Sequence, residues 1–268
     1  MYATDFEYDG RRLSDFGFII CNFGESPGEE RISTGHRIVF NKGSFNKGKR
    51  HSLIGTHYEE CITTSFSICK NPCIYNEMKI TSEEYRDIVR WLNRHTFHRL
   101  RFLSDDEYES CYYNASFNVN KITIDNVLYG IELGVETDSP FGFGAEIHEI
   151  LELSKDKEVI VKDISDEIGS ISPTIKITCP EEEITIKNIT LGTETILTGC
   201  SEGEIITIDG NTHTVSSSIS GRKETIYDNF NYDYFKLGNT IDNRDNIIKA
   251  SDDCILEIIY RPTIKWLP

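Results

Sequence analysis

The chain has 268 residues, a length that corresponds to about two domains of ~150 residues each. Ile, Thr and Val together supply 67 residues and Ala only four, so strand-favouring side chains far outnumber the best helix former. This balance excludes an all-helical protein and a coiled coil. The sequence has no apolar run of ~18 residues that would predict a membrane-spanning helix, and its acidic, aromatic start is not typical of a secretory signal.

The net charge of −16 disfavours two classes of partner, the nucleic-acid backbone and the anionic membrane surface, because both attract positive charge. The charge is uneven, with −5 in residues 1–140 and −11 in residues 141–268. The second half is therefore expected to present a well-solvated outer surface, and no membrane partner is expected.

The first half of the chain begins with a short apolar segment, Phe16 to Phe23. Residues Asn41 to Arg50, NKGSFNKGKR, hold two glycines and four basic residues without apolar periodicity, which predicts a hairpin tip or an exposed arm. Cys61 to Cys69, CITTSFSIC, alternates apolar and polar positions and predicts a half-buried strand.

One helix is predicted after this strand. Thr81 to Glu84 forms a capping box, and Tyr85, Ile88, Trp91 and Leu92 then fall on one helical face, so the helix should end near Arg94. Further strands are predicted at Arg99 to Leu103, Tyr112 to Ile124 and Tyr129 to Glu136, the last two joined by a turn at Asp125-Asn126.

Ser139 to Gly144, SPFGFG, interrupts both kinds of regular structure and places the domain boundary at about residue 140, giving domains 1–140 and 141–268. Asp209-Gly210-Asn211 signals a hairpin in the second half. Roughly eight short strands with frequent turns predict a β-sandwich there. The candidates are Val159 to Ile164, Thr174 to Thr178, Glu183 to Leu191, Glu194 to Leu197, Glu204 to Ile208, Thr212 to Ser217, Tyr234 to Leu237 and Ile255 to Tyr260.

The eight cysteines are interpreted as reduced thiols, most of them buried as small hydrophobic side chains. Cys69, Cys73, His95 and His98 could form a Cys₂His₂ zinc site in principle, but their spacing departs from the usual finger and the alternative of core thiols with surface histidines is favoured. No metal and no cofactor are expected.

No nucleophile elbow, zinc-protease motif or phosphate-binding loop is present in the sequence, so no catalytic residues are assigned and an enzyme is not expected. The acidic runs at Asp105 to Glu107 and at Glu181 to Glu183 are interpreted as solvated surface. A group of aromatic residues could stack on a sugar, although strand alternation would bury half of them. These residues are Tyr227, Phe230, Tyr232, Tyr234 and Trp266.

The whole chain resembles the distal tail (Dit) proteins of siphophages. The opening FEYDGRRLSDFGFIICNF (Phe6 to Phe23) resembles the family's first strand, around Asp9-Gly10, and the apolar run after it. The helix Thr81 to Leu92 with LRFLSDDEYESCYYNASF (Leu100 to Phe117) resembles its helix, strand and tyrosine-rich hairpin. Asp138 to Phe141 resembles the motif that closes its first domain, while Thr207 to Ser217 and Phe235 to Trp266 resemble its last strands.

This resemblance implies a mainly β protein: a tail-tube-like β-barrel or sandwich with one α-helix, then a galectin-like β-sandwich. It implies a structural virion protein, the distal tail hub of a phage or prophage, forming a hexameric ring, with a back-to-back double ring as a further form. The implied partners are the tail tube protein, the tail-tip or tail-associated lysin protein and the tape-measure protein, with DNA passing through the lumen. Assembly would take place in the bacterial host cytoplasm.

The segment Ser33 to His57 is a candidate arm that reaches a neighbouring subunit. Lys42, Lys47, Lys49 and Arg50 either contact an acidic patch on that neighbour or line the lumen; the first is favoured, since a basic lumen would hold DNA by its phosphates. Two other functions stay open. They are a carbohydrate-binding module in the C-terminal domain and a tail-associated hydrolase.

Overall fold

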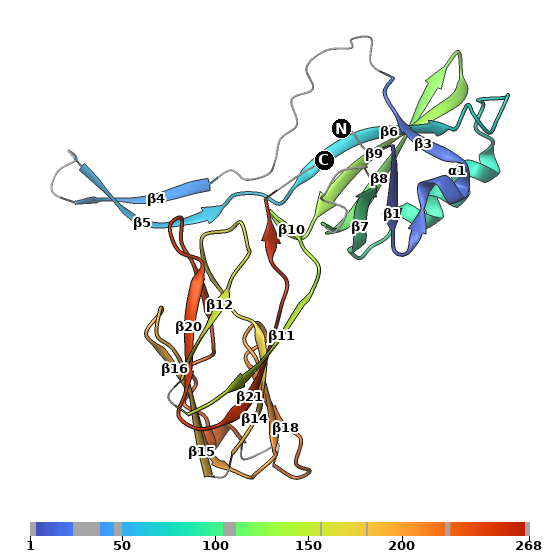
Figure 1. Ribbon diagram of the computed structural model, residues 1–268. Coiled ribbons are helices and arrows are strands. Elements are labelled where there is room, and N and C mark those ends of the chain that lie inside the picture. The colour runs from blue at the N-terminus through green and yellow to red at the C-terminus, as the bar shows by residue number, and fades with distance from the viewer. Residues whose placement is uncertain are drawn as a thin grey trace. The chain divides into compact units, whose positions relative to one another are not determined.

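The computed structural model describes residues 4–23, 38–45, 50–103, 111–155, 157–180, 182–222 and 226–265. The chain divides into two compact units, Met1–Phe143 with Lys265–Pro268, and Gly144–Ile264. Both are built mainly from β-strands, and the mainly β architecture expected from the sequence is the one observed (Figure 1). No helix in the described ranges is long and apolar enough to span a bilayer.

The first unit is built on a seven-stranded sheet with the order β2-β1-β7-β8-β9-β6-β3. Its strands are β1 (Asp5–Tyr8), β2 (Arg11–Arg12), β3 (Phe18–Cys21), β6 (Thr63–Lys70), β7 (His98–Leu103), β8 (Tyr113–Ile124) and β9 (Val127–Thr137). The same unit contains β4 (Ile38–Phe45), β5 (Arg50–Tyr58), β10 (Gly142–Phe143), the 3₁₀ turn η1 (Leu13–Phe16) and the helix α1 (Ser82–Leu92).

The sheet of the first unit curves back on itself. All its strand pairs are antiparallel, and the Ile20 amide in its last strand donates a hydrogen bond to the carbonyl of Thr4, just before β1, at 3.1 Å. A twisted sheet whose ends approach each other in this way has the curvature of a barrel.

Two tight turns of this sheet rest on left-handed backbone conformations. Asp9 and Gly10 have φ of 52° and 76°, and Asp125 and Asn126 have φ of 49° and 64°. Both pairs suit a two-residue hairpin turn. The Asp125-Asn126 turn was predicted correctly, whereas the strand expected around Asp9-Gly10 is wrong, because these residues form the turn between β1 and β2.

The predicted helix and its cap are confirmed. The Thr81 hydroxyl accepts the Glu84 amide at 3.2 Å, and the Glu84 carboxylate accepts the Thr81 amide at 2.7 Å. The helix ends at Leu92, two residues earlier than expected, and buries Ile88, Trp91 and Leu92.

The core of the first unit is aromatic. The Trp91 ring stacks on Phe6 with centroids 5.6 Å apart, and its indole N–H donates to the Tyr8 carbonyl at 3.1 Å. Phe66 and Phe117 contact the same Phe6 ring. The helix is thereby fixed against the sheet, and the alternation predicted for Cys61 to Cys69 is realised with Ile62, Phe66 and Ile68 buried.

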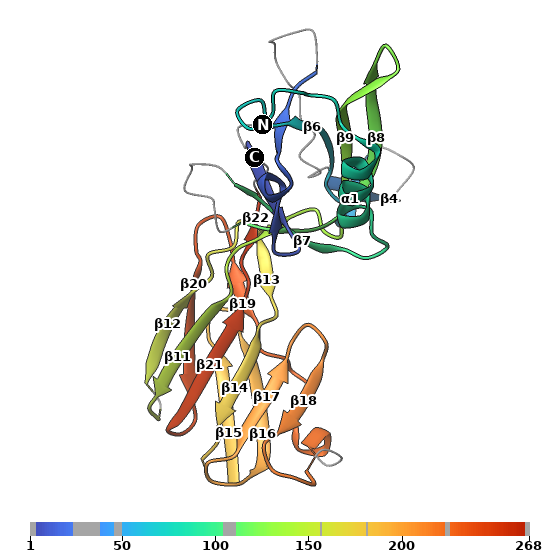
Figure 2. The ribbon, with the colours of Figure 1, turned by 90° about the vertical axis from the view of Figure 1, so that its right-hand side faces the viewer.

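The second unit is a sandwich of two antiparallel sheets, with the orders β11-β21-β14-β17-β18 and β12-β20-β15-β16 (Figure 2). The first sheet contains β11 (Ile147–Leu153), β14 (Thr174–Thr178), β17 (Ile205–Asp209), β18 (Thr214–Ser217) and β21 (Cys254–Tyr260). The second contains β12 (Glu158–Lys162), β15 (Glu182–Asn188), β16 (Thr193–Cys200) and β20 (Asp245–Ala250). The smaller elements are β13 (Gly169–Ile171), β19 (Leu237–Asn239), β22 (Thr263–Ile264) and the 3₁₀ turn η2 (Ile226–Asn229).

The inward-facing residues of both sheets form one apolar core, in which Ile is the commonest residue. Seven of the eight strands predicted here are present within a few residues. The predicted strand Tyr234 to Leu237 is wrong: Phe235 and Leu237 are buried, but only Leu237–Asn239 pairs as a strand, with β13. Four strands went unpredicted: β11, β13, β20 and β22. Ile150 and Ile247 face outward and mask the alternation of β11 and β20, while β13 and β22 are very short.

Candidate interaction hairpin

Strands β4 and β5 form a two-stranded antiparallel ribbon that pairs with no other strand in the described part of the chain. Ile38 lies opposite Tyr58, and Phe40 lies opposite Thr56. The register shifts between Asn41 and Lys42, which leaves Ile54 as the extra residue of a bulge. An isolated ribbon of this kind is marginally stable in water, so it requires a partner surface.

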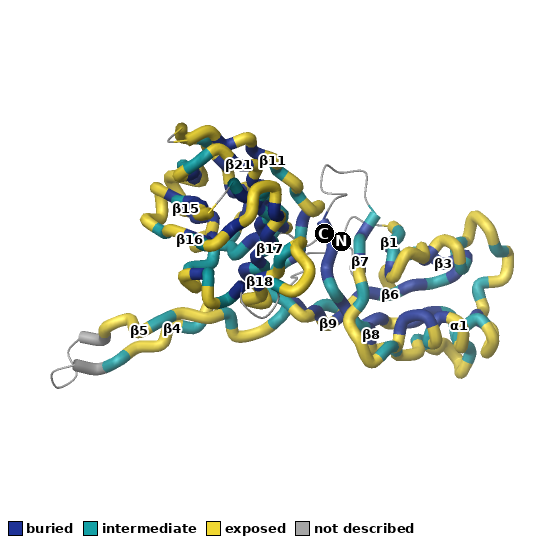
Figure 3. Tube along the Cα trace, turned by 90° about the horizontal axis from the view of Figure 1, so that it is seen from below, coloured by how far each residue is buried: buried dark blue, intermediate teal, exposed yellow. Residues whose placement is uncertain are grey.

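Large apolar side chains on this ribbon are exposed, and Figure 3 shows its described residues as exposed or intermediate, with none buried. The exposed fractions are 43% for Ile38, 53% for Phe40, 59% for Leu53 and 71% for Ile54. Scattered exposed hydrophobic residues are normal, but four of them on one unsupported ribbon mark an interaction surface.

The segment that contains the ribbon is positively charged, in contrast to the rest of the chain. Residues 31–58 of the sequence contain six Lys or Arg and no Asp or Glu. Because the whole chain carries −16, this segment carries +6 and the rest carries −22. Surfaces of the same chain are therefore complementary to the ribbon in charge.

Two of the four basic residues predicted for the interface, Lys42 and Arg50, lie in the described part of the chain. Lys42 lies on β4, is exposed and places its ammonium 5.9 Å from the centre of the Phe40 ring. Arg50 begins β5. Lys47 and Lys49 lie outside the described residues. The apolar residues Leu53 and Ile54 were not singled out from the sequence, and the signal that could have found them is the long acid-free segment around them.

The base of the ribbon is held by aromatic contacts within the first unit. The Tyr58 ring meets the edge of Phe141 at a centroid distance of 4.8 Å. The Lys265 ammonium lies 5.7 Å from the Tyr58 ring and 5.6 Å from the Phe141 ring. These contacts of Tyr58 hold the base of the ribbon within the first unit.

The residues weighed as zinc ligands lie on different elements. Cys69 lies on β6, Cys73 lies in the turn after that strand, and His98 begins β7, where its ring faces Asp9 at 3.5 Å. Within the described ranges, no group of three or more His, Cys, Asp or Glu residues could hold a metal ion.

Aromatic residues weighed as a sugar site cluster on the second unit. Tyr227 and Tyr232 are stacked at 6.4 Å, Phe230 lies 5.6 Å from Tyr232, and His213 stacks on Tyr234 at 4.5 Å. Phe230 is buried, while Tyr232 is 61% exposed. Trp266 lies outside the described residues, as do Asp105 to Glu107 and Glu181.

Two family models of phage tail domains match most of the chain. Residues 1–139 match the model of a phage tail protein N-terminal domain. Residues 141–260 match the model of a phage tail C-terminal domain.

Similar proteins agree with these matches. The chain is 28% identical over 192 residues to the SPbeta prophage-derived uncharacterized protein YomH of Bacillus subtilis (strain 168), covering 70% of this chain and 72% of that protein. Its fold is similar to the crystal structure of SPP1 Dit (gp 19.1), described as a paradigm of the hub adsorption apparatus in phages that infect Gram-positive bacteria. That match has a TM-score of 0.64 at 14% identity and covers 96% of this chain and 98% of the other. The chain thus belongs to the phage tail protein family and has a Dit-like fold.

Proposed function

We propose that this tail protein is the distal tail hub of a siphophage or prophage, and that six copies close into a ring. The observation that carries this proposal is the β4–β5 ribbon, which exposes four large apolar side chains and pairs with no other described strand. A head-to-tail contact repeated around a closed rotation gives a ring, and an arm from each subunit onto the next is one way to make such a contact.

In this proposal the first unit, residues 1–140 as predicted, is the ring-forming tail-tube-like domain, and the second is a galectin-like sandwich. The ring joins the tail tube protein to the tail-tip or tail-associated lysin protein, in the neighbourhood of the tape-measure protein, and two rings can stack back to back. The protein is a virion component assembled in the host cytoplasm. Its role is structural rather than enzymatic, as its membership of a phage tail family suggests.

The basic residues Lys42, Lys47, Lys49 and Arg50 are assigned to the contact between subunits rather than to the lumen. With +6 on the arm segment and −22 on the rest of the chain, a neighbouring copy attracts the arm. A basic lumen would instead bind passing DNA through its phosphates and slow its passage.

Oligomer mass and ring shape test the proposal. The chain with Lys42, Lys47, Lys49 and Arg50 all changed to Glu is compared with the unaltered chain by light scattering and negative-stain imaging. The unaltered chain is expected to give six-fold rings, and the altered chain is expected to give monomers at the same concentration.

A matched control changes four exposed basic residues of the second unit, Lys155, Lys162, Lys236 and Arg244, to Glu. The net charge changes equally in both variants, so only the position differs. The control is expected to form rings. A monomeric unaltered chain would overturn the hub proposal, while equal rings from both variants would overturn the role of the arm.

Carbohydrate binding by the second unit is the second candidate, favoured by the exposed Tyr232 ring beside Tyr227 and Phe230. Aromatic faces of this kind stack on sugar rings. Calorimetry with cell-wall polysaccharide fragments tests it: binding by the unaltered chain that is lost in Tyr232→Ala, with the fold retained by circular dichroism, would support it.

A further inference from the structure

A groove in the first unit, where β2 and η1 meet the second half of α1, is lined by arginines. Its volume is about 460 Å³. The residues that line it are Arg11, Phe16, Asp87, Arg90, Trp91 and Arg94, and none of them belongs to the β4–β5 ribbon. This arginine groove is therefore a surface separate from the arm discussed above.

Stacked aromatic rings support the first of these arginines. The Phe16 ring lies on the Trp91 ring with centroids 4.5 Å apart, and Trp91 is buried on the inner face of α1. The Arg11 guanidinium lies 5.2 Å from the centre of the Phe16 ring. A cation over an aromatic face is attracted by the ring and keeps its N–H groups for an acceptor elsewhere.

Arg94 is fixed at the groove by two hydrogen bonds. Its Nε donates to the Trp91 carbonyl at 2.9 Å, and its Nη1 donates to the Asp9 carboxylate at 2.6 Å. Its Nη2 has no acceptor among the described residues, so it can donate to a ligand. A guanidinium that is already held in place loses little freedom when it binds.

Arg90 and Arg11 carry the unpaired charges of the groove. Arg90 is exposed on α1, and Arg11 is exposed on β2. Within the described ranges, neither guanidinium forms an ion pair with a carboxylate, and Asp87, the acidic residue of the lining, does not pair with Arg90. The groove thus gathers positive charge that the first unit leaves without a counter-ion.

The sequence around the groove shows the same excess. Residues 85–101 contain five Arg and one Asp, a net charge of +4, in a chain whose net charge is −16. Cations gathered in one place repel one another, and an anionic partner relieves that repulsion. The groove and the partner it needs are therefore complementary in charge.

We propose that the arginine groove binds an acidic peptide segment of a partner protein through its Asp or Glu carboxylates. The planar guanidinium matches a carboxylate with two parallel N–H···O bonds, and such charge-assisted bonds are about twice as strong as neutral ones. The Phe16 ring adds an apolar surface on which the methylene groups of a Glu side chain can pack.

Two observations favour a peptide over a nucleic acid. A polyphosphate longer than the groove would meet the surface of a chain with a net charge of −16, which repels it. The Asp87 carboxylate in the lining adds a local repulsion that a ligand of dense charge feels most. A short acidic segment places its few carboxylates on the arginines alone.

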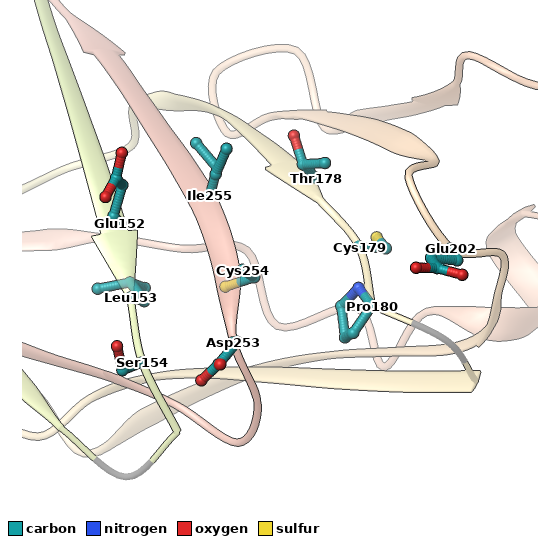
Figure 4. A pocket seen from close by; sticks show the side chains of 10 residues that line it. All are labelled: Glu152, Leu153, Ser154, Thr178, Cys179, Pro180, Glu202, Asp253, Cys254 and Ile255. Carbon is teal, nitrogen blue, oxygen red and sulfur yellow. The ribbon is translucent and has the colours of Figure 1, made fainter.

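The larger pocket of the second unit provides a contrast. It has a volume of about 570 Å³, and its charged lining residues are Glu152, Glu202 and Asp253, all acidic. Figure 4 shows these three carboxylates at separate places on the wall, without convergence on one point. An acidic peptide is repelled there, so binding of such a peptide does not report on this pocket.

Fluorescence anisotropy of the purified full-length chain with a fluorescein-labelled oligoglutamate peptide at low salt tests the proposal. The peptide is expected to bind, and added salt is expected to weaken the complex. A labelled oligothymidylate of similar charge is measured in parallel and should bind more weakly. Failure of the oligoglutamate to bind, or tighter binding of the oligothymidylate, would overturn the proposal.

A double variant locates the site. Arg11→Gln with Arg90→Gln should weaken oligoglutamate binding about tenfold. The matched control is Lys42→Gln with Arg50→Gln, which removes the same charge from the β4–β5 ribbon and should retain the affinity within about twofold. Equal weakening in the two variants would show that the peptide does not depend on the groove, contrary to the proposal.

Asp87→Asn gives a change of the opposite sign. Asp87 is exposed, so the variant should fold, and loss of its repulsion should tighten oligoglutamate binding about twofold. A folding defect does not raise affinity, so this variant decides the question even if the double arginine variant fails to fold. Unchanged or weaker binding by Asp87→Asn would count against the groove.

The proposal does not depend on ring formation. Peptide binding is measured on the chain in whatever oligomeric state it adopts, whereas the hub proposal is tested by oligomer mass and ring shape. Failure of one measurement therefore leaves the other result intact.

Discussion

The Lys70 ammonium on β6 lies 2.8 Å from the carboxylate of Glu84, the same carboxylate that caps α1. The other carboxylate oxygen of Glu84 accepts hydrogen bonds from the Thr81 amide at 2.7 Å and from the Thr81 hydroxyl at 2.9 Å. The Lys70 side chain is only 7% exposed. One carboxylate thus joins the start of the only described α-helix to the sheet on which it packs.

Glu84→Gln should destabilise the first unit. The change removes the charge partner of an almost buried Lys70 and weakens the helix cap, and the expected loss is about 1–3 kcal/mol because Glu84 itself is partly exposed. Urea unfolding measures it. Glu83→Gln, one residue earlier and exposed, is the control and should change stability by less than about 0.5 kcal/mol.

The same carboxylate predicts a pH dependence. Burial raises the pKa of Glu84, but the hydrogen bonds from Lys70 and Thr81 outweigh this and lower the pKa below its ordinary value of 4.5. A group whose pKa is lower in the folded state stabilises it fully above the unfolded pKa and loses that effect as pH falls. The stability difference between the unaltered chain and Glu84→Gln should therefore be constant above about pH 5.5 and shrink below about pH 4.5. A difference that grows on acidification would contradict this assignment.

Asn246→Ala should destabilise the second unit. The buried Asn246 amide accepts the Gly238 amide at 2.7 Å and donates to the Gly238 carbonyl at 3.0 Å, which holds β19 against β20. Truncation leaves both backbone groups without these bonds inside the protein, at an expected loss of about 2–4 kcal/mol. Thermal unfolding measures it, and Asn211→Ala, on an exposed turn, should change little.

Arg222→Met should lower the stability of the second unit more than a double change that removes the charges of both Arg222 and Glu204. The Glu204 side chain is fully buried, pairs with Arg222 and also accepts the Ser217 hydroxyl. Loss of the cation alone leaves a buried carboxylate unpaired, which costs about 3–5 kcal/mol. The double variant Glu204→Gln with Arg222→Met should recover a large part of that loss in urea unfolding. Equal losses in the two variants would show that the charge pair is unimportant.

Changes at the ribbon should affect association rather than folding. Ile54 is the bulge residue and is 71% exposed, so Ile54→Ser should leave the unfolding midpoint nearly unchanged. If a neighbouring copy covers this residue, the variant should shift the equilibrium from rings to monomers, as measured by sedimentation. Ile241→Ser is a matched control, because Ile241 is 83% exposed on a turn of the second unit.

Much of the local structure could be predicted because it depends on neighbours in sequence. The capping box of Thr81 and Glu84 defined the start of the helix, and Asp125-Asn126 defined a turn through its backbone preferences. The hairpin signalled by Asp209-Gly210-Asn211 is also present. The residue with a left-handed backbone in this hairpin is His213, not Gly210 or Asn211. The Asp209 carboxylate accepts the amides of Asn211 and Thr212, and the turn is therefore longer than two residues.

The sequence by itself determined the strand-rich class and the helix with its buried face, since these follow from side-chain type and short-range spacing. The resemblance to tail proteins came separately, from residue runs along the chain that are similar to those of a known family. Only the tertiary structure showed that β4 and β5 pair with no other described strand, and that the Trp91 indole donates to the Tyr8 carbonyl. Both depend on which segments distant in sequence are brought together. Composition and periodicity describe which face of a strand is apolar, but they do not determine which other strand will cover that face.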